Sequence, residues 1–393
     1  MNQIKCNGFI WINKSFLLMS LKSISRRQLL AATGSFGLIS VAGCTSAAAP
    51  VTEEKITAHS SSAGVSMDAL PPLEGSLTIY SGRKESLVGD LFVMIQDRYP
   101  NLDLGIRYDK STALANQIRV EGENTPADIF YTVSTGGLGL LKNEGMTVPV
   151  NPDVIKAGRE GYVDPQGHWI GTSGRLRCIV YNTNEIKDAS IIPKSIFELP
   201  KVAEIQGKIG WAPTYGSHTD FVTCMRYLHG RKKTLRWLED MKSAGVKDYT
   251  KESNVTEAVL AGEIHVGVVN HYYPMRVKND PMGHSYGSGS HIDIAFTEND
   301  AGCFMNVAGA TIVKNPRQNY DLASNFIRHL LSTEAQQFFV GNMKFEYPMI
   351  PGLEADSRLP NLAELKTPDV DLIEFASQDI NDTISLQEEA GVL

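Results

Sequence analysis

The chain contains few cysteines, five among 393 residues, and no Cys-x-x-Cys pair. Three of them, Cys178, Cys224 and Cys303, lie in the body of the chain and are far apart. An odd number of widely spaced cysteines argues against a disulfide framework. Each has apolar neighbours, so we expect buried free thiols.

The sequence also lacks the short motifs of nucleotide and zinc sites. It has no Walker A loop, no G-x-G-x-x-G, no H-E-x-x-H and no Cys/His pairs at zinc spacing. The net charge is −7, and no basic stripe of the kind that binds nucleic acid is present. Hydrophobic residues make up 42% of the chain, which is enough for two ordinary cores.

The first 43 residues differ from the rest in charge, since they hold five Lys or Arg residues and no Asp or Glu. The run Ser25–Leu30 (SRRQLL) is typical of a twin-arginine export signal, and an apolar stretch follows, from Leu29 to Ala42. That stretch is shorter than the roughly 20 residues that a spanning helix needs. It ends in Val41–Cys44 (VAGC), the pattern of a lipobox, in which the Cys44 thiol accepts a lipid. We therefore predict an export signal over 1–43.

Residues 44–75 are rich in Ala, Ser, Thr and Pro and show no periodicity, which predicts a flexible linker between a lipid anchor and a folded body. Met19 stands just ahead of the export signal, and we expect it to be the true start of translation. The protein is then expected outside the cytoplasm, held at the outer face of the cytoplasmic membrane by lipidated Cys44 alone.

From residue 76 onward, short β-rich runs alternate with runs of helical periodicity, which predicts an α/β fold whose sheet is largely parallel and covered by helices. Strands are expected over 76–81, 102–108, 127–131, 177–182, 208–212, 265–270 and 306–313. Helices are expected over 85–97, 113–120, 137–143, 221–229, 234–243, 323–331 and 333–340. Two such series suggest two lobes with a cleft, and ligands of open α/β sheets collect at the carboxyl ends of strands.

The strongest local pattern is Asn270-His271-Tyr272-Tyr273, directly after an apolar strand. A phenol has a pKa of about 10, but a hard, highly charged cation such as Fe(III) binds phenolate oxygen in preference to the proton. Tyr272 and Tyr273 are therefore candidate ferric ligands. Tyrosines at strand ends also occur as packing residues at the edge of a core, so the pair alone leaves both interpretations open.

Two further segments offer groups that bind anions. Arg175 and Arg177 lead into a strand, and their guanidinium forks suit carbonate or phosphate; pairing with a nearby carboxylate is the alternative. The turn Thr214–Ser217 precedes a helix, and free backbone N–H groups at a helix start bind anions. An ordinary N-cap is the alternative there, and both interpretations are compatible.

Gly283–Gly287 (GHSYG) matches the G-x-S-x-G motif, in which Ser285 would be the nucleophile of a hydrolase. The motif needs a buried strand before it and a helix after it. Here a Lys-Asn-Asp-Pro run precedes it and a Gly/Ser run follows, which favours a loop. We expect no enzyme.

Seven ordered segments resemble the ferric-ion-binding proteins of bacterial iron ABC importers, in the type II periplasmic-binding-protein superfamily. The segments are TIYSGRKESLV (78–88), PADIFYT (126–132), WIGTSGRLRCIVYN (169–182), IGWAPTYGS (209–217), AGEIHVGVVNHYY (261–273), NVAGATIV (306–313) and FEYPMIPG (345–352). The resemblance implies an α/β, two-lobed type II periplasmic-binding-protein fold with a ligand cleft between the lobes. One lobe would comprise 76–175 and 305–355, and the other 176–304 and 356–393. The lobes would close about hinge strands near Arg177–Asn182 and Asn306–Val313.

The resemblance also implies that Tyr272 and Tyr273 ligate Fe(III) beside a synergistic anion such as carbonate or phosphate. The expected partners are an ABC permease and its ATPase, with no nucleic acid, and we expect a monomer. The positions expected to bind the anion or line the cleft are Arg83, Lys84, Ser134, Arg175, Arg177, Thr214, Gly216, Ser217 and Asn270.

The sequence departs from the family pattern at three positions. Lys84 and Val133 stand where some members have a His and a Glu ligand, and Glu252 stands where an asparagine helps to hold the anion. Tyr215 lies in the anion turn, and our hypothesis is that it supplies a third phenolate or a hydrogen bond. Tyr80 ends the first strand, and we expect it to pack.

Two other interpretations remain at this point. The same fold can bind a different ligand, such as a phosphonate or an organic cation, on which paired tyrosine rings could stack. A surface adhesin or structural lipoprotein is the second, and the pattern of a cleft-forming α/β protein disfavours it.

Overall fold

The computed structural model describes residues 64–280, 291–315, 317, 319–341 and 343–393. The predicted export signal, Cys44 and the Gly283–Gly287 segment lie outside these residues. Within them, no helix combines the length and the apolar character needed to cross a membrane.

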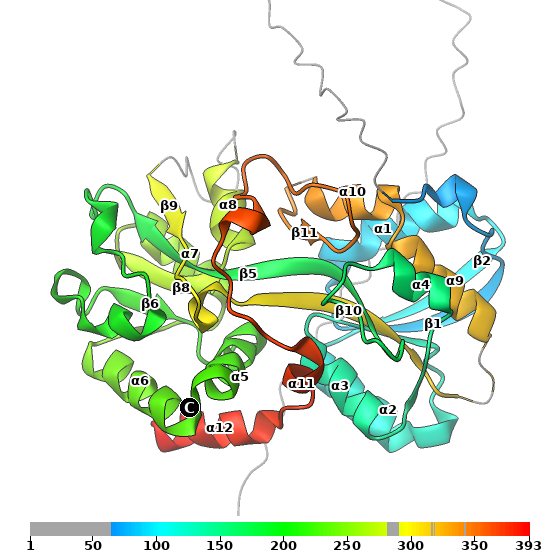
Figure 1. Cartoon of the computed structure of the whole chain (residues 1–393), viewed down its shortest axis with the longest axis horizontal. Helices are drawn as coiled ribbons and strands as arrows, with labels where there is room; N and C mark the ends of the chain where they lie inside the picture. The colour runs from blue at the N-terminus through cyan, green and yellow to red at the C-terminus, as the bar shows by residue number, and fades with distance from the viewer. Residues whose placement is uncertain (1–63, 281–290, 316, 318, 342) are drawn as a thin grey trace, which may run out of the picture. The chain divides into compact units, whose positions relative to one another are not determined.

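A mixed sheet of eleven strands runs through the described residues (Figure 1). The strands are β1 (Gly75–Ser81), β2 (Leu102–Tyr108), β3 (Ile129–Thr132), β4 (Thr147–Val148), β5 (Ile170–Asn182), β6 (Ile209–Trp211), β7 (Lys247–Asp248), β8 (Val266–Asn270), β9 (Ile292–Ala295), β10 (Met305–Val313) and β11 (Tyr347–Pro348). The main path is β2-β1-β3-β10-β5-β8-β6-β7. The strands pair in parallel within β2-β1-β3 and within β8-β6-β7, whereas β10 and β5 pair antiparallel to their neighbours. Two parallel groups are thus joined through two long central strands.

Helices cover both faces of each parallel group (Figure 1). They are α1 (Glu85–Arg98), α2 (Ser111–Glu121), α3 (Thr135–Asn143), α4 (Pro152–Ala157), α5 (Gly216–His229), α6 (Arg231–Ser243), α7 (Glu252–Leu260), α8 (Tyr272–Lys278), α9 (Tyr320–Leu330), α10 (Thr333–Val340), α11 (Leu372–Ala376) and α12 (Ile380–Glu389). The alternation of strand side chains explains this arrangement. In β3, Ile129 joins a core with α1, α9 and α10, whereas its neighbour Phe130 joins a core with α2 and α3.

The thirteen-residue strand β5 belongs to both parts of the sheet. Its first half, Ile170–Leu176, pairs with β10, and its second half pairs with β8 from Arg177 onward. Every residue of β5 is buried, so the strand passes through the interior along its whole length. The strand predicted over 177–182 is therefore the second half of a longer one, in the position of a hinge strand.

The predicted elements are confirmed in type and order, with bounds that differ by a few residues. Helices α4, α7, α8, α11 and α12 were not predicted. The flexible linker predicted over 44–75 is wrong from residue 65 onward, because that segment is packed. Val65 accepts a backbone hydrogen bond from Thr333, and the fully buried Met67 donates its N–H to Glu334 at 2.9 Å.

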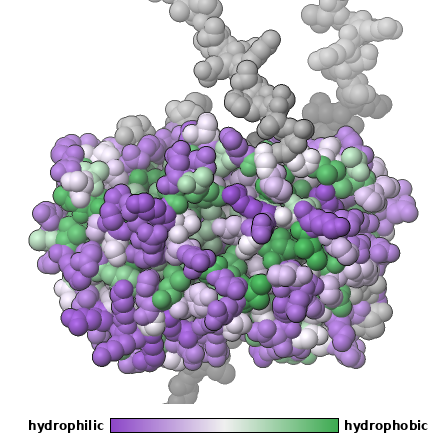
Figure 2. All heavy atoms as spheres, viewed as in Figure 1, coloured by the Kyte–Doolittle hydropathy of each residue, from purple (hydrophilic) through white to green (hydrophobic). Residues whose placement is uncertain are grey.

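The C-terminal segment contacts elements of both predicted lobes. Helix α11 packs against α3, so closely that a Cβ added at Gly139 would lie 2.0 Å from the Ala376 carbonyl oxygen. Helix α12 packs against α5 and α6 instead. The face drawn in Figure 2 is mostly hydrophilic, with hydrophobic residues gathered toward its middle.

Candidate functional site

Three tyrosines come together where two strands of the second parallel group end. Tyr215 follows β6 and is the N-cap of α5, and Tyr272 and Tyr273 follow β8 and open α8. The Tyr215 and Tyr273 phenol oxygens are hydrogen-bonded at 2.9 Å. The Tyr272 and Tyr273 ring centroids are 4.4 Å apart. All three side chains are partly exposed, so solvent reaches the group.

Burial favours the neutral form of two of these phenols, Tyr215 and Tyr273. It raises the pKa of both Tyr215 and Tyr273, and the negative charge of Glu252 raises each further. The hydrogen bond between the two hydroxyls requires that at least one of them carries its proton. A cation that binds here must therefore displace protons.

His271 fixes the start of α8. It is fully buried, and its Nδ1 lies 3.1 Å from the Leu176 N–H while its Nε2 lies 2.6 Å from the Phe345 carbonyl oxygen. These partners require a neutral ring that accepts at Nδ1 and donates at Nε2, and burial lowers the pKa of His271 to about 4. The ring thereby ties Tyr272 to β5 and to the segment around Phe345. His271 was not among the predicted site residues, although it stands inside the NHYY run.

Glu252, the first residue of α7, occupies the centre of the predicted anion site. Its carboxylate is fully buried and accepts hydrogen bonds from Arg177, from the Ser217 hydroxyl at 2.5 Å and from the Asn270 N–H at 2.9 Å. Three groups predicted to bind an external anion are thus already paired. This corrects the prediction for Arg177, because a buried guanidinium needs a counter-charge and Glu252 provides it. At Ser217 the hydroxyl is paired, whereas the backbone N–H has no partner among the described residues.

Arg175 has a different environment from Arg177. It is buried, yet its guanidinium forms no hydrogen bond or ion pair with any residue in the described ranges. Its charge acts on Tyr215 and on Asp220. At the start of α5, the Gly216 and Ser217 N–H groups likewise donate to no other described group. Among the groups predicted to bind an anion, these have no protein partner in the described residues, and Thr214 and Gly216 are exposed beside them.

Asp220 of α5 links several segments around Arg175. Asn306 of β10 donates to its carboxylate at 2.9 Å, and both Asn306 and Ser134 act to lower its pKa. Burial raises the pKa of Asp220 to about 6, although Arg175 and Arg177 both oppose that rise. Ser134, the N-cap of α3, therefore lies near Asp220 of α5. Asp220 was not among the residues predicted from the sequence.

Arg83 does not present a free guanidinium. It is fully buried and bidentate to Glu346, at 2.7 and 3.1 Å, and it also donates to Ser173 at 2.6 Å. The pair holds the pKa of Glu346 down at about 2. The expectation that Arg83 binds an anion is therefore corrected. Lys84, by contrast, is exposed at the N-cap of α1.

The other positions named from the sequence have ordinary structural surroundings. Val133 is half-buried at the end of β3, and its N–H donates to Ser111 at 3.3 Å. The Tyr80 hydroxyl donates to Glu121 of α2, in agreement with a packing role. The three body cysteines are buried and free, as predicted.

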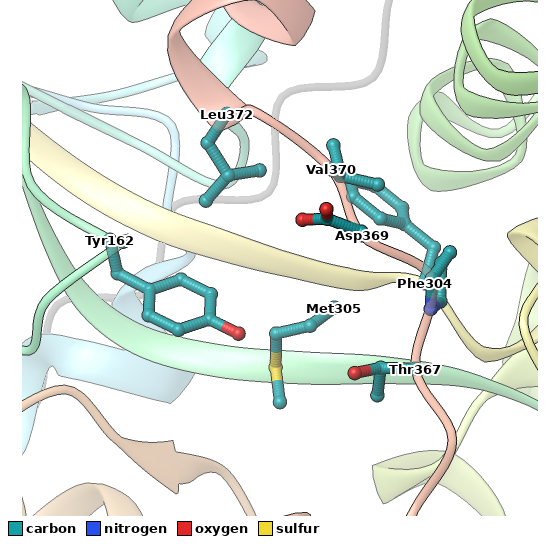
Figure 3. A pocket seen from close by; sticks show the side chains of 9 residues that line it. Tyr162, Phe304, Met305, Thr367, Asp369, Val370 and Leu372 are labelled. Carbon is teal, nitrogen blue, oxygen red and sulfur yellow. The ribbon is translucent and has the colours of Figure 1, made fainter.

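Acidic, histidine and cysteine side chains offer no alternative metal centre in the described part of the chain, where no three of them are grouped suitably. A pocket of about 380 Å³ lies elsewhere, where β10 meets the segment 367–372. Figure 3 shows Tyr162 and Thr367 on opposite sides of it, with Met305 between them. None of the candidate tyrosines or arginines lines this pocket.

Polar and phenolic groups at the strand ends of an open α/β sheet occupy the position where such sheets bind ligands. The family model for bacterial extracellular solute-binding proteins matches residues 124–374, and the chain belongs to that family. The type II fold and the family resemblance inferred from the sequence are confirmed.

Individual relatives are proteins of iron uptake. The Fe(3+)-binding periplasmic protein of Serratia marcescens is 29% identical over 318 residues, which cover 81% of this chain and 90% of that protein. Iron-bound HitA from Pseudomonas aeruginosa has a TM-score of 0.72 and 27% identity, covering 82% of this chain and all of that one. The fold alone is shared with AfuA from Actinobacillus pleuropneumoniae, which holds fructose-6-phosphate (TM-score 0.67, 17% identity, 81% and 99% covered).

Proposed function

We propose that this chain is the extracytoplasmic substrate-binding lipoprotein of an ABC importer and captures Fe(III) through Tyr215, Tyr272 and Tyr273. The 2.9 Å separation of the Tyr215 and Tyr273 oxygens carries the proposal. Two oxygens at adjacent corners of an octahedron with metal–oxygen bonds of about 2.0 Å lie about 2.8 Å apart. The two phenols are therefore already at the spacing that one small, hard cation requires.

Proton release accompanies binding in this mechanism. Fe(III) replaces the protons of the phenols, since its charge outweighs the preference of a buried tyrosine for the neutral form. Because protons and Fe(III) compete for the same oxygens, acid favours release. Closure of the two lobes about β5 and β10 would bury the ion, and reopening would deliver it to the permease.

A small anion such as carbonate or phosphate would bind next to the tyrosines. Arg175 and the Gly216 and Ser217 N–H groups are available there, and the start of α5 favours negative charge. An anion bound to them would lie beside Tyr215. Arg177 is not among its donors, because that guanidinium is paired with Glu252.

The remaining parts of the proposal concern location and partners. Lipidated Cys44 would hold the protein at the outer face of the cytoplasmic membrane after twin-arginine export, where it serves a permease and its ATPase as a monomer. Membrane fractionation tests the anchor: Cys44→Ala should move the protein from the membrane to the soluble extracytoplasmic fraction. Retention of that variant in the membrane would contradict the role of Cys44.

An organic cation is disfavoured as the ligand. Stacking on the tyrosine pair would need an open ring face, but the Arg276 guanidinium already lies 4.6 Å from the Tyr272 ring centroid. Arg276 is held there by hydrogen bonds to the Met343 and Lys344 carbonyl oxygens. A second cation at this position would be repelled.

Absorption spectroscopy tests ferric capture. Titration of the iron-free protein with ferric citrate plus bicarbonate should give a visible phenolate-to-iron band that saturates at one equivalent. The band should be lost in the double variant Tyr272→Phe/Tyr273→Phe and weakened in Tyr215→Phe. The control is Tyr80→Phe, which removes a phenol bonded to Glu121 and should leave the band intact. A flat spectrum without thermal stabilisation would refute ferric binding.

A further inference from the structure

The buried carboxylate of Glu252 accepts hydrogen bonds from groups that an incoming anion would otherwise use. One oxygen accepts from Arg177 and from Ser217, and the other accepts from the Asn270 N–H. These donors come from β5, from α5 and from the end of β8, so three elements converge on a single negative charge. The start of α7 adds a favourable dipole, since Glu252 is its first residue.

External anions cannot reach this position in the structure. Glu252 is 0% exposed and Arg177 is 2% exposed. Arg177 is further enclosed by the Phe221 ring, 4.9 Å from its guanidinium carbon, and by the Val268 carbonyl oxygen, to which it donates at 3.2 Å. A carbonate or phosphate ion would have to displace a covalently attached carboxylate that already accepts three hydrogen bonds.

Glu252 also lies close enough to the phenols for its charge to act on them. Its negative charge influences both Tyr215 and Tyr273. It also accepts a hydrogen bond from the N–H of Asn270, which stands two residues before Tyr272. A trivalent cation bound at these phenols would be attracted by the same charge, and attraction of this kind is strong where water is excluded.

We propose that Glu252 is a built-in counter-anion, which supplies from the chain itself the negative charge that carbonate or phosphate would otherwise bring to the ferric site. Fe(III) binding by this protein then does not require an added anion, and an anion at Arg175 is optional. The inference rests on the proposed ferric capture and adds a specificity-determining residue to it.

The test is a comparison of Fe(III) affinity with and without added anion. Iron is supplied to the purified full chain as the acetohydroxamate complex, in buffer freed of carbonate and phosphate, and then with bicarbonate or inorganic phosphate added. For the natural chain, either anion should change the affinity by less than about threefold. In Glu252→Ala, which opens space at Arg177, the affinity without anion should fall and bicarbonate should restore it by about tenfold or more, a normal size for coupling between two ligands.

Two variants control for shape and for loss of a carboxylate. Glu252→Gln keeps the volume but not the charge, so it should bind iron more weakly without rescue by bicarbonate. Glu334→Gln removes a carboxylate from the first turn of α10, where it accepts from Ser66 and Met67, and it should behave like the natural chain.

The outcomes separate the two proposals. A natural chain that needs bicarbonate or phosphate for tight binding would overturn the role of Glu252 while ferric capture stands. Binding by Glu252→Ala that equals the natural chain without anion would overturn it as well. If the Glu252 variants do not fold, the titrations of the natural chain decide alone. Absence of a ferric band under every condition would refute ferric capture itself.

Discussion

The buried ion pair between Arg83 and Glu346 allows a stability prediction of defined size. Both side chains are almost completely inaccessible, and replacing one partner of such a pair leaves a buried charge uncompensated. Glu346→Gln should therefore lower the free energy of unfolding by about 3–5 kcal/mol at neutral pH. The pKa of Glu346 gives a second route to the magnitude. Its fall from 4.5 to about 2 corresponds to about 3 kcal/mol of stabilisation.

The pH dependence has a definite sign. Because folding depresses this pKa, the stabilisation is fully present above about pH 5 and is lost as the pH falls toward 2. The contribution of the carboxylate should decline from about 3 kcal/mol at neutral pH to about 1 kcal/mol near pH 3. The difference in stability between the natural chain and Glu346→Gln should shrink accordingly.

Urea unfolding at neutral pH and near pH 3 measures both quantities. The control is Glu198→Gln, which breaks an exposed pair with Lys201 at 2.8 Å and should change stability little. A loss below about 1 kcal/mol for Glu346→Gln at neutral pH would refute the reasoning, since typical buried pairs cost more to break. A difference that stays constant as the pH falls would refute the assignment of the low pKa.

Two further predictions concern packing and a second buried carboxyl group. Gly139→Ala should lower the free energy of unfolding by about 1–3 kcal/mol, because the added methyl group would collide with the Ala376 carbonyl oxygen. The control is Gly136→Ala in the same helix, where the methyl group meets nothing within 4 Å and the change should be neutral or stabilising. Equal melting temperatures for the two variants would contradict this packing. Asp220 has a pKa raised from 3.8 to about 6, so its contribution to stability falls as the pH rises through that window. Asp220→Asn should therefore raise the melting temperature near pH 8 but not near pH 4, and a gain that is the same at both pH values in scanning calorimetry would contradict the assignment.

Local sequence patterns predicted those helices and strands whose formation depends on the residues within the segment itself. The β-rich runs of β1 and β3 and the helical spacing of α1 are read directly from neighbouring residues, and the structure confirms these elements. Helix α8 was missed because it begins with two tyrosines and a proline, which carry little helical preference. Its position is fixed by His271, whose partners Leu176 and Phe345 are distant in the chain.

The residues of the candidate site differ in the same way: some are adjacent in the sequence, and others are brought together only by the fold. The adjacent Tyr272 and Tyr273 could be identified from the sequence because the signal is contiguous. Tyr215 could only be a hypothesis, because its approach to Tyr273 depends on how β6 and β8 lie in the sheet. The partner of Arg83 could not be inferred, since Glu346 lies 263 residues further along the chain.

Arg175 and Arg177 show why chemistry alone does not assign a role. They are two residues apart in one strand, and such residues point to the same face of a sheet. The strand changes neighbours between them, however. Arg175 stands opposite Asn306 of β10, whereas Arg177 stands opposite Asn270 of β8, whose N–H shares the Glu252 carboxylate. The Arg177 guanidinium is therefore paired with Glu252 within the second parallel group, whereas the Arg175 guanidinium, near Tyr215, has no partner in the described part of the chain. The register of β5 thus decides which of the two arginines can bind a ligand.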